Sequence, residues 1–315
     1  MAIQHLLDGT ESSLRRFLQT LSPVDHVGAH ERAAMLGTRS IKTTSKRWAI
    51  DMAISMVDLT TLEGADTPGK VRALCSKALR PDPRDLTVPH VGAVCVYNDM
   101  VGIARQYLDS IGGHHLPVAA VSTAFPSGRA SHAVKIQDTK DAIELGATEI
   151  DMVIDRGAFL SGKLGEVFDE ISAIKSICGE RAHLKVILET GELVTLDNVR
   201  KASYLAMLAG ADFIKTSTGK VSPAATPPVV LVMLEAVRDY FAMTNNRIGV
   251  KPAGGIRTTK DAIKQLVLVN EIAGPEWLDP SLFRIGASAL LNDLLLQRMK
   301  MANGRYSSSN YVTVD

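Results

Sequence analysis

Eight short apolar runs, separated by segments of helical character, constrain the fold of this chain more than any other feature. From about residue 50 onward the runs begin roughly every 33 residues, a spacing that fits one strand–loop–helix–loop unit. Most of them are apolar throughout, as expected of parallel strands that are buried on both faces. The predicted strands are residues 53–59, 91–97, 117–123, 149–154, 184–190, 211–216, 248–253 and 282–287.

The intervals between these runs carry signals for the ends of helices. Thr67 and Pro68 suit the first positions of a helix after the first strand. Thr195 can cap a helix over residues 196–208, which Gly210 would close. Eight such units, with no Gly-x-Gly-x-x-Gly sequence at the first of them, predict an α/β fold of the TIM (β/α)8 barrel type rather than a Rossmann sheet.

The repeat divides the chain into three segments. Residues 1–49 precede it and form a predicted N-terminal helical extension, with helices near 12–21 and 31–36 that would cover the bottom of the barrel or a subunit contact. The catalytic barrel is expected over residues 50–300. Residues 301–315 become polar and serine-rich, so we expect a flexible C-terminal tail.

Charge and composition argue against several classes of function. The formal net charge is +1, from 35 basic and 34 acidic residues, which gives no electrostatic reason to expect nucleic acid or a membrane as a partner. No apolar stretch approaches the ~20 residues that cross a bilayer, and the N-terminus lacks the features of a secretory signal. Three widely spaced cysteines, Cys75, Cys95 and Cys178, predict free thiols in a reducing, cytoplasmic compartment. No metal-ligand spacing occurs, so we expect no metal.

Two lysines stand at the carboxyl ends of the sixth and seventh predicted strands. Lys215 opens into a turn of hydroxyl residues and glycine, and Lys251 repeats the arrangement ahead of Gly254 and Gly255. A lysine is seldom buried without a partner, although a stem that crosses apolar surface to reach solvent is the ordinary alternative. The carboxyl ends of strands hold the active sites of TIM barrels. An amine in a dry pocket beside another cation has a lowered pKa, so the pattern predicts an imine-forming enzyme.

An internal echo places a carboxylate near the first of these lysines. The heptapeptide that ends at Asp151 resembles the one that ends at Lys215, because each has a helix-closing glycine, an alanine and then a strand with a charged residue. Alternate strands of a barrel contribute side chains to the same inner layer, so Asp151 and Lys215 should share one cavity. Asp58 ends the first strand among hydroxyl groups, where a helix or loop cap is the competing interpretation. Glu189, after the fifth strand, would join the cavity or brace a loop.

The loops after strands six, seven and eight predict an anion site. Their glycines let backbone N–H groups approach an oxyanion, and the helix after strand eight adds its N-terminal dipole. Ordinary tight turns are the alternative, but the loops after strands seven and eight are the usual phosphate site of this barrel. The residues concerned are Gly219, Lys220, Gly254, Gly255, Arg257 and Ser288.

Together these segments resemble the deoxyribose-phosphate aldolase family, whose members are class I aldolases on a TIM barrel. The resemblance runs from about Asp51 to Leu296. It rests on seven segments that occur in the order of the family, namely residues 57–62, 94–97, 149–151, 185–193, 213–219, 250–257 and 283–288.

The resemblance implies reversible cleavage of 2-deoxy-D-ribose 5-phosphate to D-glyceraldehyde 3-phosphate and acetaldehyde. Lys215 would form the Schiff base, Lys251 would lower its pKa, and Asp151 would relay protons with a water molecule. Because the iminium is the electron sink, no metal or organic cofactor is expected. The implied sugar-pocket residues are Asp58, Thr60 and Cys95, of which Cys95 alone would otherwise be taken for a small buried hydrophobe. The implied phosphate-binding residues are Gly219, Lys220, Gly254, Gly255, Arg257 and Ser288.

Two departures from the family pattern, and two other interpretations, stay open. Ala289 stands where bacterial members commonly carry a second serine, which leaves only its backbone N–H for a phosphate. Some members end in a tyrosine that assists proton transfer, whereas Tyr306 and Tyr311 lie before the end of this chain. The other interpretations are a different lysine-dependent barrel enzyme, such as a transaldolase, and a phosphosugar-binding protein without catalysis. The sequence does not set the oligomeric state, and a homo-oligomer is compatible with it.

Overall fold

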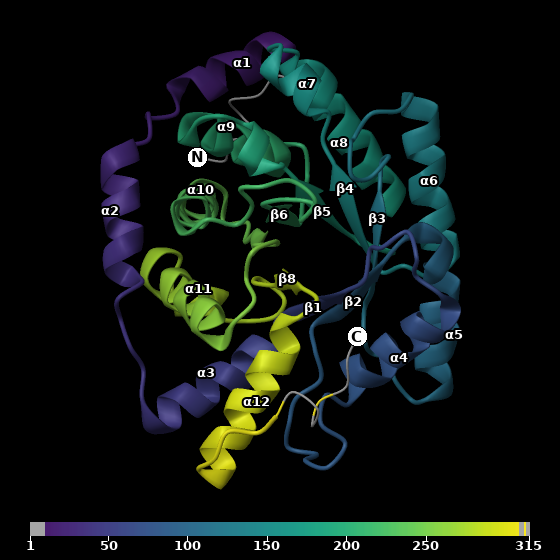
Figure 1. The fold of residues 1–315 in the computed structure, drawn as a ribbon. Coiled ribbons are helices and arrows are strands. Elements are labelled where there is room, and N and C mark those ends of the chain that lie inside the picture. Colours follow the sequence, from purple (N-terminus) through teal and green to yellow (C-terminus); the bar gives the residue numbers. More distant parts are fainter. Residues whose placement is uncertain (1–9, 309–311, 313–315) are drawn as a thin grey trace.

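The apolar runs form the strands of a closed barrel. The computed structural model describes residues 10–308 and residue 312. Within them eight parallel strands pair in the order β7-β6-β5-β4-β3-β2-β1-β8. Bridges Val250–Phe283 and Ala253–Gly286 then join β7 to β8, which confirms the predicted TIM barrel (Figure 1). The strands are β1 Val57–Thr60, β2 Ala93–Val96, β3 Val118–Ser122, β4 Glu149–Val153, β5 His183–Ile187, β6 Phe213–Lys215, β7 Gly249–Lys251 and β8 Ile285–Ala287.

Helices cover the outside of the barrel, and the N-terminal extension adds to this layer (Figure 1). Helix α1 packs against α8 and α9, α2 against α10 and α11, and α3 against α11 and α12. The extension therefore lies along the outer helices of the barrel. The helices are α1 Glu11–Thr20, α2 His26–Leu36, α3 Thr43–Ser55, α4 Pro68–Leu79, α5 Val101–Ser110, α6 His132–Glu144, α7 Arg156–Leu160, α8 Leu164–Cys178, α9 Leu196–Leu208, α10 Pro227–Thr244, α11 Thr259–Ile272 and α12 Leu290–Asn303.

The first strand differs from the prediction. It begins at Val57, because residues 53–55 still belong to α3. The buried residues Ala49, Ile50, Ala53 and Ile54 follow the spacing of a helix face that packs on the core. A short apolar run cannot be assigned to helix or strand from periodicity alone, and here the last helical turn runs almost directly into the strand.

The predicted helix starts are capped as their sequences indicate. The Thr67 hydroxyl accepts a hydrogen bond from the N–H of Lys70 at the start of α4. Thr195 does the same for Asn198 at the start of α9. Thr258 begins α11 with a capping box, in which Asp261 bonds back to the N–H of Thr258. Each such cap contributes about 1 kcal/mol. All three helices follow strands that supply residues of the site described below.

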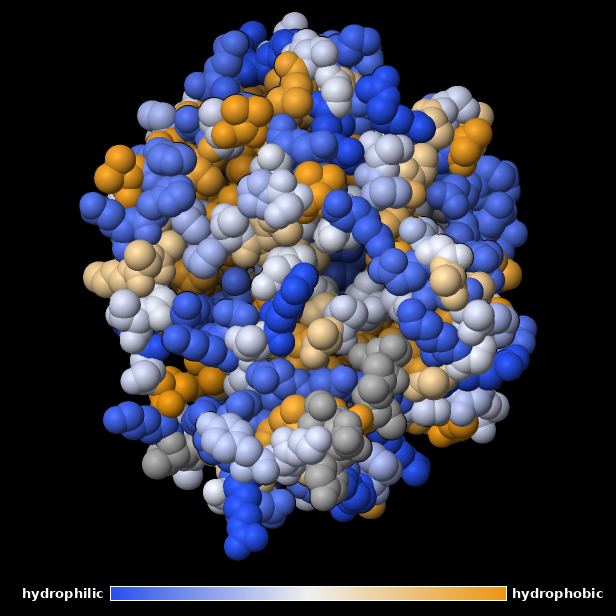
Figure 2. Space-filling model, in the orientation of Figure 1, coloured by the Kyte–Doolittle hydropathy of each residue, from blue (hydrophilic) through white to orange (hydrophobic). Residues whose placement is uncertain are grey.

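The outward faces of the strands and the inner faces of the helices form the apolar core. Val94, Ile150, Ile214 and Val250 are fully buried in it. All three cysteines are buried and unpaired, as predicted. No helix among the described residues is long and apolar enough to span a membrane. Charged and polar side chains dominate the face seen in Figure 2, with apolar atoms in scattered patches.

Candidate active site

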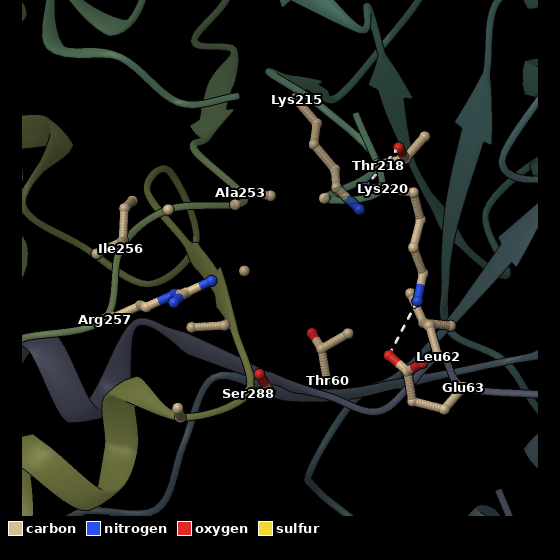
Figure 3. Close-up of a pocket in the computed structure, with 16 residues that line it drawn as sticks. Thr60, Leu62, Glu63, Lys215, Thr218, Lys220, Ala253, Ile256, Arg257 and Ser288 are labelled. Carbon is tan, nitrogen blue, oxygen red and sulfur yellow. Dashed lines mark hydrogen bonds and ion pairs between the residues drawn. The ribbon is translucent and has the colours of Figure 1, made fainter. Parts of the chain in front are cut away.

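A cavity of about 190 Å³ lies at the carboxyl ends of β1, β6, β7 and β8. Its lining joins the loops after these four strands, and the amine of Lys215 points into it (Figure 3). Eight residues that the sequence singled out line this cavity: Thr60, Lys215, Gly219, Lys220, Gly254, Gly255, Arg257 and Ser288. The structure therefore brings the proposed nucleophile and the proposed phosphate loops to one opening.

Lys215 and Asp151 meet inside the barrel, as the internal echo suggested. Asp151 pairs in register with Lys185 on β5, and Lys185 pairs with Phe213 on β6, two residues before Lys215. Because barrel strands are staggered, a shift of this kind brings alternate strands to the same inner layer. Lys215 Nζ donates to Asp151 Oδ2 over 2.7 Å, and Lys215 is only 3% exposed.

Below Lys215, six charged side chains form a closed ring of alternating sign, here called the charge ring. Each member makes an ion pair with the next, and the side chains are at most 8% exposed. Lys251 Nζ lies 2.5 Å from Asp58 Oδ2 and 2.7 Å from Asp151 Oδ2. Arg284 lies 2.7 Å from Asp58 and 3.1 Å from Glu149. Lys185 closes the ring between Glu149 and Asp151, 3.5 Å from Asp151 Oδ1.

The charges of the ring cancel, and Lys215 is a further cation attached to it through Asp151. The ring holds three cations and three carboxylates. A buried charge is stable only when it is paired, so a protonated Lys215 would leave the group with one uncompensated positive charge. The group is neutral when Lys215 is neutral.

The pKa shifts of the two lysines follow this charge balance. Burial lowers the pKa of Lys215, and Lys251 lowers it further, against the opposing attraction of Asp151. Burial would lower the pKa of Lys251 too, but the carboxylates of Asp151 and Asp58 outweigh it and raise that pKa. Burial opposes ionisation of Asp151, yet Lys215 and Lys251 hold its pKa well below the usual value. Lys215 is therefore the amine suited to act as a nucleophile, and Lys251 stays a cation.

The three predicted sugar-pocket residues lie at different depths. Thr60 lines the cavity, and its hydroxyl donates to the backbone carbonyl of Asp58 over 2.8 Å. Asp58 is fully buried, and its carboxylate is used by Lys251 and Arg284. Cys95 is fully buried below the opening, among Leu62, Ala119 and Val121, and burial raises the pKa of its thiol. Neither Asp58 nor Cys95 is part of the cavity wall.

The predicted phosphate loop after β7 requires glycine at two positions. Gly254 has a φ of +84°, and a Cβ added there would lie 2.7 Å from the Cβ of Ala224. Gly255 also has a positive φ, of +83°. Glycine adopts a positive φ readily and other residues seldom do, so the backbone at both positions favours glycine. Ser288 and Ala289 lie beside this loop, ahead of the first turn of α12.

A family model described as DeoC/LacD family aldolase matches residues 52–295 of the chain. The chain belongs to this aldolase family. The curated deoxyribose-phosphate aldolase of Homo sapiens is 46% identical over 296 residues, which cover 90% of this chain and 92% of that protein. The corresponding protein of Mus musculus is 45% identical over the same shares. The tetrameric structure of deoxyribose phosphate aldolase from Aeropyrum pernix has a TM-score of 0.64 at 24% identity, covering 87% of this chain and 98% of that one, which shows the shared fold.

In this aldolase-family chain, three members of the charge ring escaped the sequence analysis. Lys185, Glu149 and Arg284 all lie within or beside strands of low polarity, as Lys215 does. That was the available signal: a charged residue inside a strand that is buried on both faces. The complete pairing could not be found in the same way, because the contact between Arg284 and Glu149 joins β8 to β4, which are not neighbours in the sheet.

Glu189 braces the loop after β6. It is fully buried in a left-handed backbone conformation, with a φ of 52°. Its carboxylate accepts hydrogen bonds from the N–H of Thr218 and, over 2.5 Å, from the Thr218 hydroxyl. Thr218 in turn accepts from the N–H of Lys220. Of the two roles considered for Glu189, the structure supports the loop brace, which holds Gly219 and Lys220 in place.

Lys220 is already paired at the edge of the cavity of this aldolase. Its Nζ lies 2.9 Å from a carboxylate oxygen of Glu63, and Figure 3 shows this pair opposite Arg257. Glu63 was not singled out by the sequence analysis. Among the described residues that line the cavity it is the one that carries a carboxylate. A phosphate group that binds here would therefore compete with Glu63 for Lys220.

We expect Glu63→Gln to tighten the binding of inorganic phosphate by about two- to fivefold. The pair is partly exposed, and such pairs are worth up to about 1 kcal/mol, which limits the effect. Isothermal titration calorimetry of phosphate against both proteins measures it. The matched control is the same substitution in a Lys220→Met background, where no gain is expected. Unchanged or weaker binding in the single variant would show that Lys220 does not face the anion.

Of the two tyrosines of the tail, the structure describes Tyr306. Tyr306 is 77% exposed and packs on the amine of Lys300, which lies 3.5 Å from its ring centroid. Tyr311 lies outside the described residues. Helix α12 extends to Asn303, so the first residues of the expected tail are helical. Among the described residues, no group of three or more histidine, cysteine or acidic side chains is arranged to hold a metal ion.

Proposed function

We propose that this chain is a class I deoxyribose-phosphate aldolase that uses Lys215 as its Schiff-base lysine. The observation that carries the proposal is the amine of Lys215, which lines the cavity and pairs with Asp151 of a charge ring that is already neutral without it. The names of the curated human and mouse relatives support a deoxyribose phosphate as the substrate. The proposed reaction is the cleavage of 2-deoxy-D-ribose 5-phosphate to D-glyceraldehyde 3-phosphate and acetaldehyde.

In the cleavage direction, the neutral amine of Lys215 adds to the aldehyde carbon of the open-chain sugar. Loss of water gives an iminium, which withdraws electrons from the neighbouring carbon. A base removes the proton of the hydroxyl group on carbon 3, and the bond between carbons 2 and 3 breaks. Glyceraldehyde 3-phosphate leaves, and the electron pair forms an enamine. Protonation of the enamine and hydrolysis of the resulting iminium release acetaldehyde and restore the amine.

Asp151 is the group placed to move protons in these steps. Its Oδ2 atom lies 2.7 Å from the amines of both Lys215 and Lys251. Its Oδ1 atom accepts no hydrogen bond within the part of the chain that the structure describes, so it can accept one from a water molecule. Asp151 would then act with that water as general acid and base, while Lys251 remains protonated and fixes the carboxylate.

The loops after β6, β7 and β8 would hold the 5-phosphate. Gly219, Gly254, Gly255 and Ser288 supply backbone N–H groups or a hydroxyl around the opening, and Lys220 and Arg257 supply charge. Thr60 would contact the sugar directly. Asp58 and Cys95 lie below the cavity wall, so their contribution would be indirect, Asp58 by holding Lys251 in place.

A coupled assay tests the proposal as a whole. Deoxyribose 5-phosphate is supplied in the presence of EDTA, and release of glyceraldehyde 3-phosphate is followed. Turnover supports the aldolase. Transfer of a dihydroxyacetone unit without acetaldehyde release would instead indicate a transaldolase. Phosphosugar binding without turnover, and without an imine that borohydride can reduce, would indicate a binding protein.

We expect Lys251→Leu to raise the pKa of Lys215. Loss of the neighbouring cation removes one of the two causes that lower this pKa, so a larger fraction of Lys215 is protonated near neutral pH. The acid limb of the kcat/KM profile should move to higher pH, and activity at neutral pH should fall with it. An acid limb in the same place as in the wild type would mean that Lys251 does not act on the nucleophile through its charge.

A further inference from the structure

The charge ring ties two side chains that are remote from the cavity to the nucleophile. Arg284 and Glu149 do not line the cavity, and neither has a contact with Lys215 among the ion pairs of the described residues. On one side of the ring, Arg284 is linked to it through Asp58, Lys251 and Asp151 in turn. Glu149 reaches it through Lys185 and Asp151.

We propose that Arg284 and Glu149 are positioning residues that keep the charge ring neutral and so set the protonation state of Lys215. This inference deepens the proposed function and rests on it, because the proposed function assigns Lys215 as the nucleophile. Arg284 compensates the carboxylates of both Asp58 and Glu149. Lys251 then remains a cation between Asp58 and Asp151. The ring as a whole therefore has no excess of carboxylates that would favour a proton on Lys215.

The titratable groups that surround Lys215 are members of the charge ring, apart from one thiol. On β4 it meets Asp151, and on β7 it is near Lys251. On β2 the nearest titratable group is the thiol of Cys95, which burial keeps protonated. On β5, Lys185 pairs with Asp151, which in turn pairs with Lys215. No further carboxylate of the described residues pairs with the amine of Lys215, so its proton is governed by the net charge of the ring.

The proposal predicts shifts of opposite sign for the two side chains. Arg284→Met leaves two cations and three carboxylates, so a protonated Lys215 restores neutrality and its pKa rises. Glu149→Gln leaves three cations and two carboxylates, so a protonated Lys215 is disfavoured further and its pKa falls. The double variant holds two of each, and the pKa should return toward the wild-type value. Each single shift should be roughly one pH unit, the lower end of the effect of a nearby charge.

Two readouts separate this inference from the proposed function. The first is the acid limb of kcat/KM for deoxyribose 5-phosphate, which should move up for Arg284→Met and down for Glu149→Gln. The second is the pH dependence of trace acylation of Lys215 by acetic anhydride, read from the mass of its peptide, which requires no turnover. If the wild type fails to cleave the sugar, the proposed function fails, and the acylation curves still test the charge balance.

The matched control is a buried ion pair elsewhere in the molecule. Lys135 and Glu170 lie 2.7 Å apart with side chains 2% and 13% exposed, and Lys135→Met should leave both pH curves in place. Shifts of the same sign in the two ring variants, or no shift in either, overturn the proposal. If Arg284→Met does not fold, Glu149→Gln and the double variant carry the test. If the pKa of Lys215 falls in Glu149→Gln and does not return toward the wild-type value in the double variant, the proposed charge balance is wrong.

Discussion

Replacing Lys215 with methionine should lower kcat for deoxyribose 5-phosphate by at least about 10⁴-fold, the scale on which enzymes lose activity with their covalent nucleophile. The stability should hardly change. Methionine keeps most of the volume, and the charge ring remains neutral without Lys215, so the free energy of unfolding should change by less than about 1.5 kcal/mol. Lys215→Ala should abolish turnover in the same way.

Activity and thermal unfolding together check this prediction. A coupled assay for glyceraldehyde 3-phosphate gives kcat, and a melting curve at the same pH gives the stability. The control is Lys185→Met. This variant removes a cation of the charge ring and leaves Glu149 and Asp151 without it, so it should destabilise the protein. A Lys215→Met variant that keeps a tenth or more of the wild-type turnover would assign the nucleophile to another residue.

Asp151→Asn should have the largest combined effect on activity and stability. The substitution removes the carboxylate that joins Lys215, Lys251 and Lys185. Breaking a buried pair leaves uncompensated charge and costs roughly 3–5 kcal/mol of stability. Loss of a general acid–base group should lower kcat by a further ~10²- to 10⁴-fold in the protein that remains folded.

The loss of stability in Asp151→Asn should depend on pH in a fixed direction. The pKa of Asp151 is held well below its ordinary value of 3.8 in the folded protein. The carboxylate therefore stabilises the wild type above about pH 4, and this contribution is lost as the pH falls from there through the folded-state pKa. Urea unfolding at a series of pH values should show a constant gap above pH 5 that narrows in acid. A gap that stays the same in acid would mean that the ionised form of Asp151 does not stabilise the fold.

The sequence was sufficient to predict the barrel because each strand and helix is specified locally. Buried parallel strands are apolar throughout, and caps such as Thr195 and Thr258 mark the helix starts. The exception is residues 53–55, where the buried face of a helix and the following strand form one apolar run. Only the packing of α3 on α11 and α12 decides that boundary.

The site was predictable where a residue and its strand position were enough. Lys215, Lys251 and the glycine loops follow from their place at strand ends, and Asp151 from the echo of the Lys215 segment. Arg284 and Glu149 are different, because their significance depends on the charged side chains that they pair with on other strands. A single sequence shows where each charge lies along its strand, but not which strand faces it.

Trapping the imine with borohydride shows directly whether the amine of Lys215 is neutral and nucleophilic. The wild-type protein is incubated with acetaldehyde and sodium borohydride, digested, and its peptides are weighed by mass spectrometry. We expect one ethyl group on the peptide that carries Lys215, and none on that peptide in Lys215→Met. An ethyl group found only on the peptide that carries Lys251, or on no peptide at all, would contradict this expectation.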